Sequence, residues 1–111
     1  MRLCASHELA LGASIRFPFR RGEGFAFRTA SGAVRAFVNV CPHRGQPVDV
    51  GDGRLFLPDG ALECQAHGAR FEADGGRCVG GPCAPGDALT PLRVMEGDGE
   101  VWLSEAEPDP D

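Results

Sequence analysis

Residues 41–67 read CPHRGQPVDVGDGRLFLPDGALECQAH, and the two ends of this stretch carry the pattern that decides the fold. The first end, CPH (41–43), places a thiol and an imidazole two positions apart, and the second end, CQAH (64–67), places them three positions apart. Each motif fits within one tight loop. Two such loops lying side by side would gather two sulfur and two nitrogen ligands, which can bind one tetrahedral Zn²⁺ or two iron ions.

The order of the ligands favours iron over zinc. Zinc fingers usually place both cysteines in one loop and both histidines in the other, whereas each loop here carries one of each. The mixed arrangement is typical of a [2Fe–2S] cluster in which two cysteines bind one iron and two histidines bind the other. A structural zinc module remains the least favoured alternative.

Length and composition predict one β-rich domain over residues 1–111. The chain has 111 residues with 16 Gly and 9 Pro, which indicates many turns between short strands. Strand-like runs separated by turn residues favour an all-β sandwich or barrel. The expected strands are 13–19, 25–29, 34–40, 55–57, 61–64, 69–73, 77–79, 92–95 and 100–103, with Trp102 in the core. Residues 80–86 are expected to form a rigid loop outside any strand, and the acidic tail 105–111 is expected to fray.

The net charge of −5 argues against nucleic-acid binding and against a polybasic membrane contact. An acidic surface suits solubility or docking to a basic patch on a protein partner. The sequence has neither a signal-peptide pattern nor a membrane-spanning run of about 20 apolar residues, so we expect a cytoplasmic protein. In that reducing compartment Cys78 and Cys83 are expected to be two small buried thiols, with a disulfide as the less favoured alternative.

The motifs and their surroundings resemble the Rieske ferredoxins. The matching segments are CPHRGQPVDVGDGRL, ECQAHGARFEADGGRC and VGGPCAPGDALTPLRVMEGDGEVWL, so the resemblance covers nearly the whole chain. It implies a Rieske-like small antiparallel β-sandwich with a cluster-binding subdomain of two loops. It also implies one [2Fe–2S] cluster, with Cys41 and Cys64 on the buried iron and His43 and His67 on the outer iron.

Departures from the family pattern predict a low reduction potential. High-potential Rieske proteins carry a disulfide between the two loops, at places that here hold Gln46 and Ala66. They also use Ser and Tyr hydroxyls to stabilise the reduced cluster, at places that here hold Ala69 and Phe71. The segment 80–85 is expected to act as a stiff apolar lid over the cluster.

The resemblance implies an electron carrier with no catalytic residues of its own. Such a protein would be a monomer that passes single electrons from a flavin-dependent reductase to a terminal oxygenase or a related enzyme. The main alternative is a small Rieske subunit of a larger oxidoreductase, as in some nitrite reductases. The chain lacks room for the mononuclear iron domain of a Rieske oxygenase, so it is not expected to be a complete oxygenase.

Overall fold

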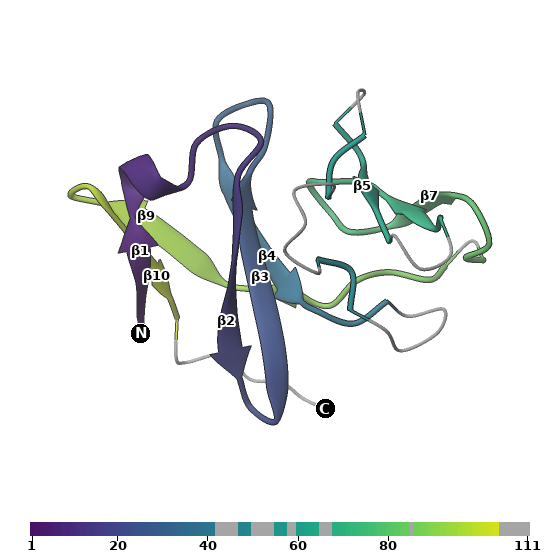
Figure 1. The fold of residues 1–111 in the computed structure, drawn as a ribbon, viewed down its shortest axis with the longest axis horizontal. Helices are drawn as coiled ribbons and strands as arrows, with labels where there is room; N and C mark the ends of the chain where they lie inside the picture. The colour runs from purple at the N-terminus through teal and green to yellow at the C-terminus, as the bar shows by residue number, and fades with distance from the viewer. Residues whose placement is uncertain (42–46, 50–54, 58–59, 65–67, 85, 105–111) are drawn as a thin grey trace.

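The computed structural model describes residues 1–41, 47–49, 55–57, 60–64, 68–84 and 86–104. These residues form three antiparallel sheets that follow one another along the longest axis (Figure 1). The outer sheet contains β1 (Arg2–Ala5), β10 (Glu100–Leu103) and β9 (Val94–Gly97). The central sheet contains β2 (Ser14–Phe19), β3 (Gly22–Arg28), β4 (Val34–Val38) and β8 (Pro91–Leu92). The small sheet contains β5 (Leu62–Glu63), β6 (Arg70–Phe71) and β7 (Cys78–Gly80).

The central sheet is covered on both faces, so its strands separate two apolar cores. Side chains alternate along a strand, and β3 sends Phe25 and Phe27 to one face and Ala26 to the other. The first face carries the site core, which is formed by Phe25, Phe27, Phe37, Cys41, Val48, Leu55, Leu62, Cys64, Ala69, Phe71, Cys83 and Leu89. The second face carries the outer core, which is formed by Cys4, Leu9, Phe17, Ala26, Val34, Ala36, Leu92, Val101 and Leu103.

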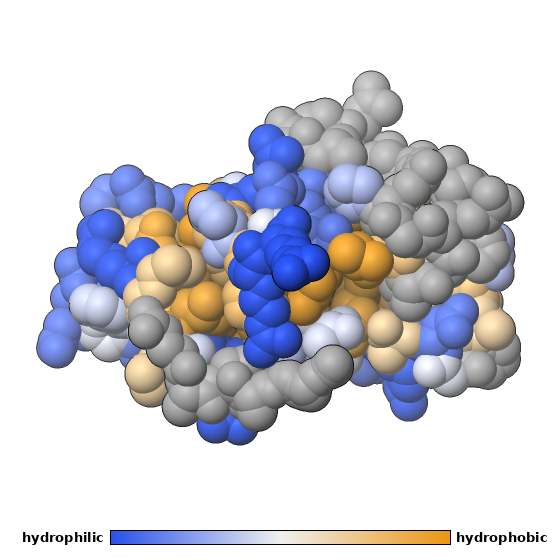
Figure 2. All heavy atoms as spheres, turned by 90° about the horizontal axis from the view of Figure 1, so that it is seen from below, coloured by the Kyte–Doolittle hydropathy of each residue, from blue (hydrophilic) through white to orange (hydrophobic). Residues whose placement is uncertain are grey.

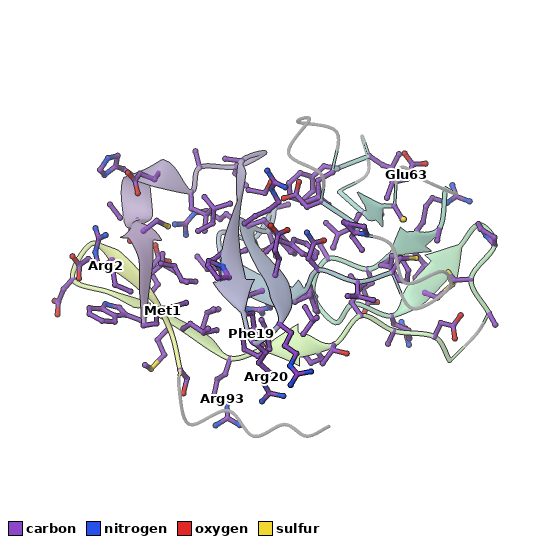
Figure 3. All side chains as sticks on the ribbon, turned by 60° about the horizontal axis from the view of Figure 1, so that its bottom comes forward. Met1, Arg2, Phe19, Arg20, Glu63 and Arg93 are labelled. Atoms are coloured by element: carbon purple, nitrogen blue, oxygen red, sulfur yellow. A yellow bond between two sulfur atoms is a disulfide. The ribbon has the colours of Figure 1, made fainter. Side chains whose placement is uncertain are left out.

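The central and outer sheets contain hairpins of consecutive strands. Strand β2 pairs with β3, and β3 pairs with β4 so that Phe25 lies opposite Phe37. Arg20, at the tip of the first hairpin, lies over the Phe19 ring with 5.0 Å between the guanidinium carbon and the ring centroid (Figure 3). Strands β9 and β10 meet at Asp98-Gly99, where both residues have positive φ, as a tight hairpin turn requires. The all-β fold predicted from the sequence is therefore confirmed.

Some local expectations were wrong. Strand β1 was not predicted, because its short mixed sequence becomes a strand only by pairing with β10 near the other end of the chain. Gly80 belongs to β7, opposite Arg70, although it was expected in a loop. Trp102 was expected in the core but is 40% exposed, since the alternation of β10 buries Val101 and Leu103 instead.

The described residues contain one helical element, the short 3-10 helix η1 (Ser6–Glu8). Across the ranges that the structure describes, no helix has the length and apolar character needed to cross a membrane.

Arg28 ties η1 and the outer sheet to the central sheet. Its guanidinium donates hydrogen bonds to the carbonyl oxygens of Leu9 (2.7 Å), Gly32 (2.8 Å) and Ser6 (3.3 Å). It also contacts the Glu96 carboxylate at 2.6 Å. Hydrogen bonds from Arg28 and then Ser6 lower the pKa of the Glu96 carboxyl to about 2 from its ordinary value of 4.5.

Arg28→Met should lower the free energy of unfolding at neutral pH by about 2 kcal/mol, because several hydrogen bonds to a charged group are lost. The folded-state pKa of Glu96 is depressed, so its contribution to stability is present above the unfolded pKa near 4.5. That contribution is lost as the pH falls toward about 2. The difference in free energy of unfolding between wild type and variant, measured by urea unfolding, should therefore become smaller as the pH falls from about 4.5 toward about 2.

Arg77→Met is the matched control. Arg77 pairs with Glu72 at 2.9 Å, but its side chain is 68% exposed. Removing this surface ion pair should lower the free energy of unfolding by less than about 1 kcal/mol. Equal losses in the two variants would contradict the role given to Arg28.

Candidate iron–sulfur centre

The side chain of Asn39 closes the first motif loop. Asn39 directly follows β4 and is 4% exposed, and its backbone N–H donates to the Glu23 carbonyl oxygen at 2.8 Å. Its Oδ1 accepts hydrogen bonds from the backbone N–H groups of Val48 (2.8 Å) and Asp49 (2.9 Å). Its Nδ2 donates to the Asp49 carbonyl oxygen at 2.9 Å. One buried amide thus joins the end of β4 to the far side of the loop that begins at Cys41.

Asp49 extends this connection to β2. Its carboxylate is buried, and Oδ2 accepts a hydrogen bond from the Ser14 hydroxyl at 2.7 Å. We call Asn39, Asp49 and Ser14 the loop clamp. The sequence interpretation missed it, although an Asn at the end of an apolar strand and two residues before a ligand motif is a signal for side-chain bonding to a following turn.

Backbone hydrogen bonds close the second motif loop. Leu62 pairs with Phe71 and Glu63 with Arg70, and the ladder continues as the Cys64 N–H donates to the Ala69 carbonyl oxygen at 2.9 Å. The Gly68 N–H donates to the Cys64 carbonyl oxygen at 2.8 Å, and Gly68 has a positive φ of 77°. Cys64, the first residue of the second motif, therefore lies at the end of the β5–β6 ladder.

The two loops meet in the site core. Cys41 and Cys64 both have 0% exposure and belong to the same apolar cluster. The Cys64 sulfur lies 3.9 Å from the carbonyl oxygen of Pro47, which belongs to the first loop. Of the predicted ligands the structure thus brings the two cysteines into one buried region. His43 and His67 lie outside the described residues.

The third loop, residues 80–84, packs against the backbone that follows the second motif. Gly81 has a positive φ of 77°, and a Cβ atom on it would lie 2.3 Å from the Gly68 carbonyl oxygen and 2.9 Å from the Ala69 Cα. Such distances are too short for any side chain, so this close approach requires glycine. The sequence interpretation did not single out Gly81.

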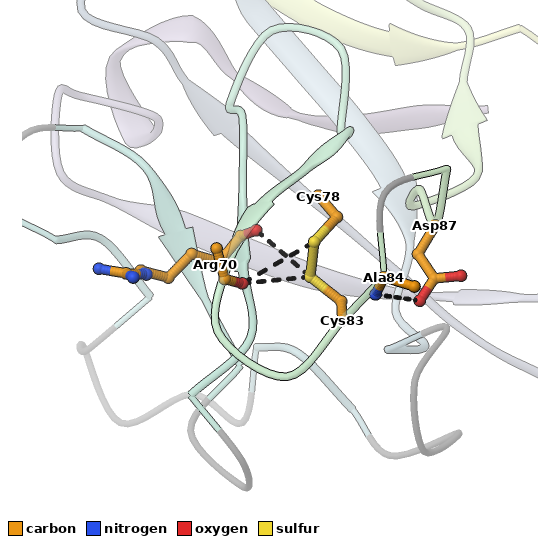
Figure 4. Close-up of a disulfide and its surroundings, with 6 residues drawn as sticks. Arg70, Cys78, Cys83, Ala84 and Asp87 are labelled. Atoms are coloured by element: carbon orange, nitrogen blue, oxygen red, sulfur yellow. Dashed lines mark hydrogen bonds between the residues drawn. A yellow bond between two sulfur atoms is a disulfide. The ribbon is translucent and has the colours of Figure 1, made fainter.

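A disulfide joins Cys78 to Cys83 across this third loop (Figure 4). The expectation of two separate thiols was therefore wrong. It was argued from the redox compartment, whereas the turn at Gly81 brings the two Cα atoms to 6.1 Å, a separation that a disulfide can span. The sequence offered one signal, namely two cysteines placed on either side of Gly-Gly-Pro.

The residues present fit a [2Fe–2S] cluster. Cys41 and Cys64 are thiols shielded from water, as expected for ligands of the inner iron. Ala69 and Phe71 are also fully buried and bring no hydroxyl group to this region, in agreement with the sequence.

Asn39→Leu should lower the free energy of unfolding by about 3 kcal/mol, because two buried N–H groups lose their acceptor in a side chain of similar size. Thr29→Val is the matched control, in the turn between β3 and β4. The Thr29 hydroxyl is buried and has its hydrogen bond with the Ser31 hydroxyl at 2.9 Å. The control should lose about 1 kcal/mol. Urea unfolding checks both, and a loss for Asn39→Leu no larger than that of the control would contradict the clamp.

Comparisons with known proteins agree with this geometry. The sequence profile described as "Rieske [2Fe-2S] domain" matches residues 1–96. The oxygenase component of dicamba O-demethylase from Stenotrophomonas maltophilia is 33% identical over 87 residues, which cover 74% of this chain and 24% of the relative. The chain thus spans about a quarter of the length of that relative.

Two solved structures have the same fold. The ferredoxin of carbazole 1,9a-dioxygenase from Nocardioides aromaticivorans IC177 has a TM-score of 0.77 at 23% identity, over 94% of this chain and 95% of that one. The terminal oxygenase of the same system has a TM-score of 0.78 at 24% identity, over 99% of this chain and 31% of that one. The chain described here therefore belongs to the Rieske [2Fe–2S] domain family and is an electron-transfer module built around a [2Fe–2S] cluster.

Proposed function

We propose that this protein is a low-potential one-electron carrier, in which Cys41, His43, Cys64 and His67 hold the cluster. The observation that carries the proposal is the burial of Cys41 and Cys64 in one core, each at the start of a loop whose motif also contains a histidine. In this assignment the cysteines bind the inner iron, and the histidines bind the outer iron nearer the surface.

The bound cluster supplies reversible one-electron transfer, and the chain controls its surroundings. The site core keeps water away from the sulfur ligands, and the loop clamp fixes the distance between the two sides of the first loop. A rigid, dry site changes little when an electron arrives, which suits rapid electron transfer. The net charge of −5 favours partners with a basic docking surface.

A separate carrier is supported by the likeness to a solved ferredoxin. The ferredoxin of carbazole 1,9a-dioxygenase has this fold over 94% of this chain and 95% of its own, so the fold is one that a ferredoxin uses. We propose a flavin-dependent reductase as the electron donor and a terminal oxygenase or related enzyme as the acceptor. The carrier is proposed to be a single-domain monomer without catalytic residues.

An exposed apolar pair favours a second candidate, a Rieske domain or small subunit fixed within a larger oxidoreductase. Met95 and Trp102 lie directly opposite each other on β9 and β10, and they are 58% and 40% exposed. The face seen from below also exposes apolar side chains on both sides of a hydrophilic ridge (Figure 2). A permanent partner would bury such side chains, whereas a free carrier need not expose them.

Electron paramagnetic resonance of anaerobically purified, dithionite-reduced protein should show a rhombic signal with an average g value below that of an all-thiolate cluster. Iron and acid-labile sulfide should each be present at two per chain. Cys41→Ser, Cys64→Ser and His67→Ala should lose this signal.

Two matched controls share the residue types of these variants. Cys4→Ser changes a buried cysteine of the outer core, and His7→Ala changes an exposed histidine in η1. Both should keep the wild-type signal. Zinc in place of iron, or a signal that survives in Cys64→Ser, would refute the assignment.

The reduction potential should lie near the lower end of the Rieske range, at about −150 mV. The physical reason is that Ala69 and Phe71 offer no hydroxyl donor to stabilise the more negative reduced cluster. A redox titration monitored by electron paramagnetic resonance measures this value. A potential above zero would contradict the carrier assignment and would point to a partner of higher potential.

A further inference from the structure

The Cys78–Cys83 disulfide lies between the solvent and the site core. Cys83 is 7% exposed and packs in the site core with Cys41 and Cys64, whereas Cys78 is partly exposed at the start of β7. Figure 4 shows the bond spanning the third loop next to Arg70. Both cysteines therefore pack with the core that holds the proposed cysteine ligands, and Cys78 is the more accessible of the two to a reagent in solution.

Carbonyl oxygens surround both sulfur atoms. The Gly80 carbonyl oxygen lies 3.2 Å from the Cys83 sulfur and 3.8 Å from the Cys78 sulfur, and the Arg70 carbonyl oxygen lies 3.8 Å from the Cys83 sulfur. A disulfide sulfur has no hydrogen to donate, so these contacts become hydrogen bonds only when the pair is reduced to thiols. The surroundings therefore accommodate the dithiol as well as the disulfide.

The disulfide restrains a segment whose two ends are held independently. At one end Gly80 pairs with Arg70 in the small sheet. At the other end the Ala84 N–H donates to the Asp87 carboxylate at 2.9 Å. Residues 81–83 lie between these anchors, and they include Gly81, which rests on the Gly68 backbone. Opening the disulfide would remove a covalent restraint on this contact while both ends stay in place.

We propose that Cys78 and Cys83 form a second redox site, a thiol–disulfide pair that accepts two electrons from a dithiol reductant and thereby changes water access to the cluster. The inference rests on the proposed function, since it assigns to that cluster a regulator within the same chain. Opening the third loop admits water, which stabilises the more negative reduced cluster. The potential of the cluster should then become more positive.

The exchange is balanced in two steps. A thiolate of the dithiol attacks the more exposed Cys78 sulfur, the Cys78–Cys83 bond breaks, and Cys83 leaves as a thiolate that takes up a proton. The second thiol of the reductant, after losing its proton, attacks the mixed disulfide and releases Cys78, which is protonated in turn. Two electrons and two protons pass to the protein, and the reductant ends as a disulfide. The reverse reaction with an oxidised dithiol restores the bond.

The test compares the intact holoprotein before and after anaerobic treatment with dithiothreitol, followed by desalting. Alkylation under denaturing conditions should rise from three labels to five, because the chain has five cysteines and the disulfide takes two. Iron content should not change, and the cluster potential should shift in the positive direction. The double variant Cys78→Ser, Cys83→Ser should show the shifted potential without treatment and should not respond to dithiothreitol.

Cys4→Ser is the control, because burial raises the pKa of the Cys4 thiol and keeps it unreactive in the outer core. It should respond to dithiothreitol as the wild type does. Equal cluster potentials in the disulfide and dithiol forms would overturn the inference, and so would a disulfide that opens only when iron is lost. Wild-type protein without iron would overturn the proposed function itself, a result that the label count distinguishes from failure of the thiol pair.

Discussion

The antiparallel pairing of β3 with β4 is the constraint on which the rest of the structure depends. The pairing places Phe25 opposite Phe37 on one face and Ala26 opposite Ala36 on the other, and each face supports one of the two cores. The large aromatic rings fill the site core, with centroids about 6.0 Å apart. The end of β4 leads directly into Asn39 and then Cys41, so the same hairpin that builds the core also sets the starting point of the first motif loop.

Several strands of this architecture can be predicted from short segments of the sequence. The runs that became β2, β3, β4 and the β9–β10 hairpin combine apolar or β-branched residues with nearby turns, and these signals need no distant partner. The spacing within the two Cys/His motifs is likewise local, and it predicts a set of two cysteine and two histidine ligands. Strand β1 depended on long-range pairing with β10, which no local pattern contains. Trp102 was misplaced because the face of β10 that packs on the outer core carries Val101 and Leu103 instead.

The candidate site also combines features that the local sequence predicts with features that depend on tertiary contacts. The burial of Cys41 and Cys64 follows from the motif, but the means of holding their loops does not. The clamp depends on Asn39 reaching Asp49 across the loop, and the third loop depends on the approach of Gly81 to Gly68. The place of Asn39 before the first motif indicates bonding to a following turn but does not identify Asp49 as the partner, and no local pattern indicates the contact between Gly81 and Gly68. The disulfide was misjudged because an argument about compartments was applied to a question that local geometry decided.

The order of the sheets along the molecule has a consequence for assembly. Met1 and Arg2 mark the end that carries the outer sheet, and Glu63, next to Cys64, marks the opposite end (Figure 3). A protein that covered Met95 and Trp102 would therefore bind at the end that carries the outer sheet, away from Cys64. A permanent partner and a transient redox partner would then bind at different ends. The domain could therefore be attached to another protein, in a natural complex or in an engineered fusion, and still exchange electrons at its proposed cluster.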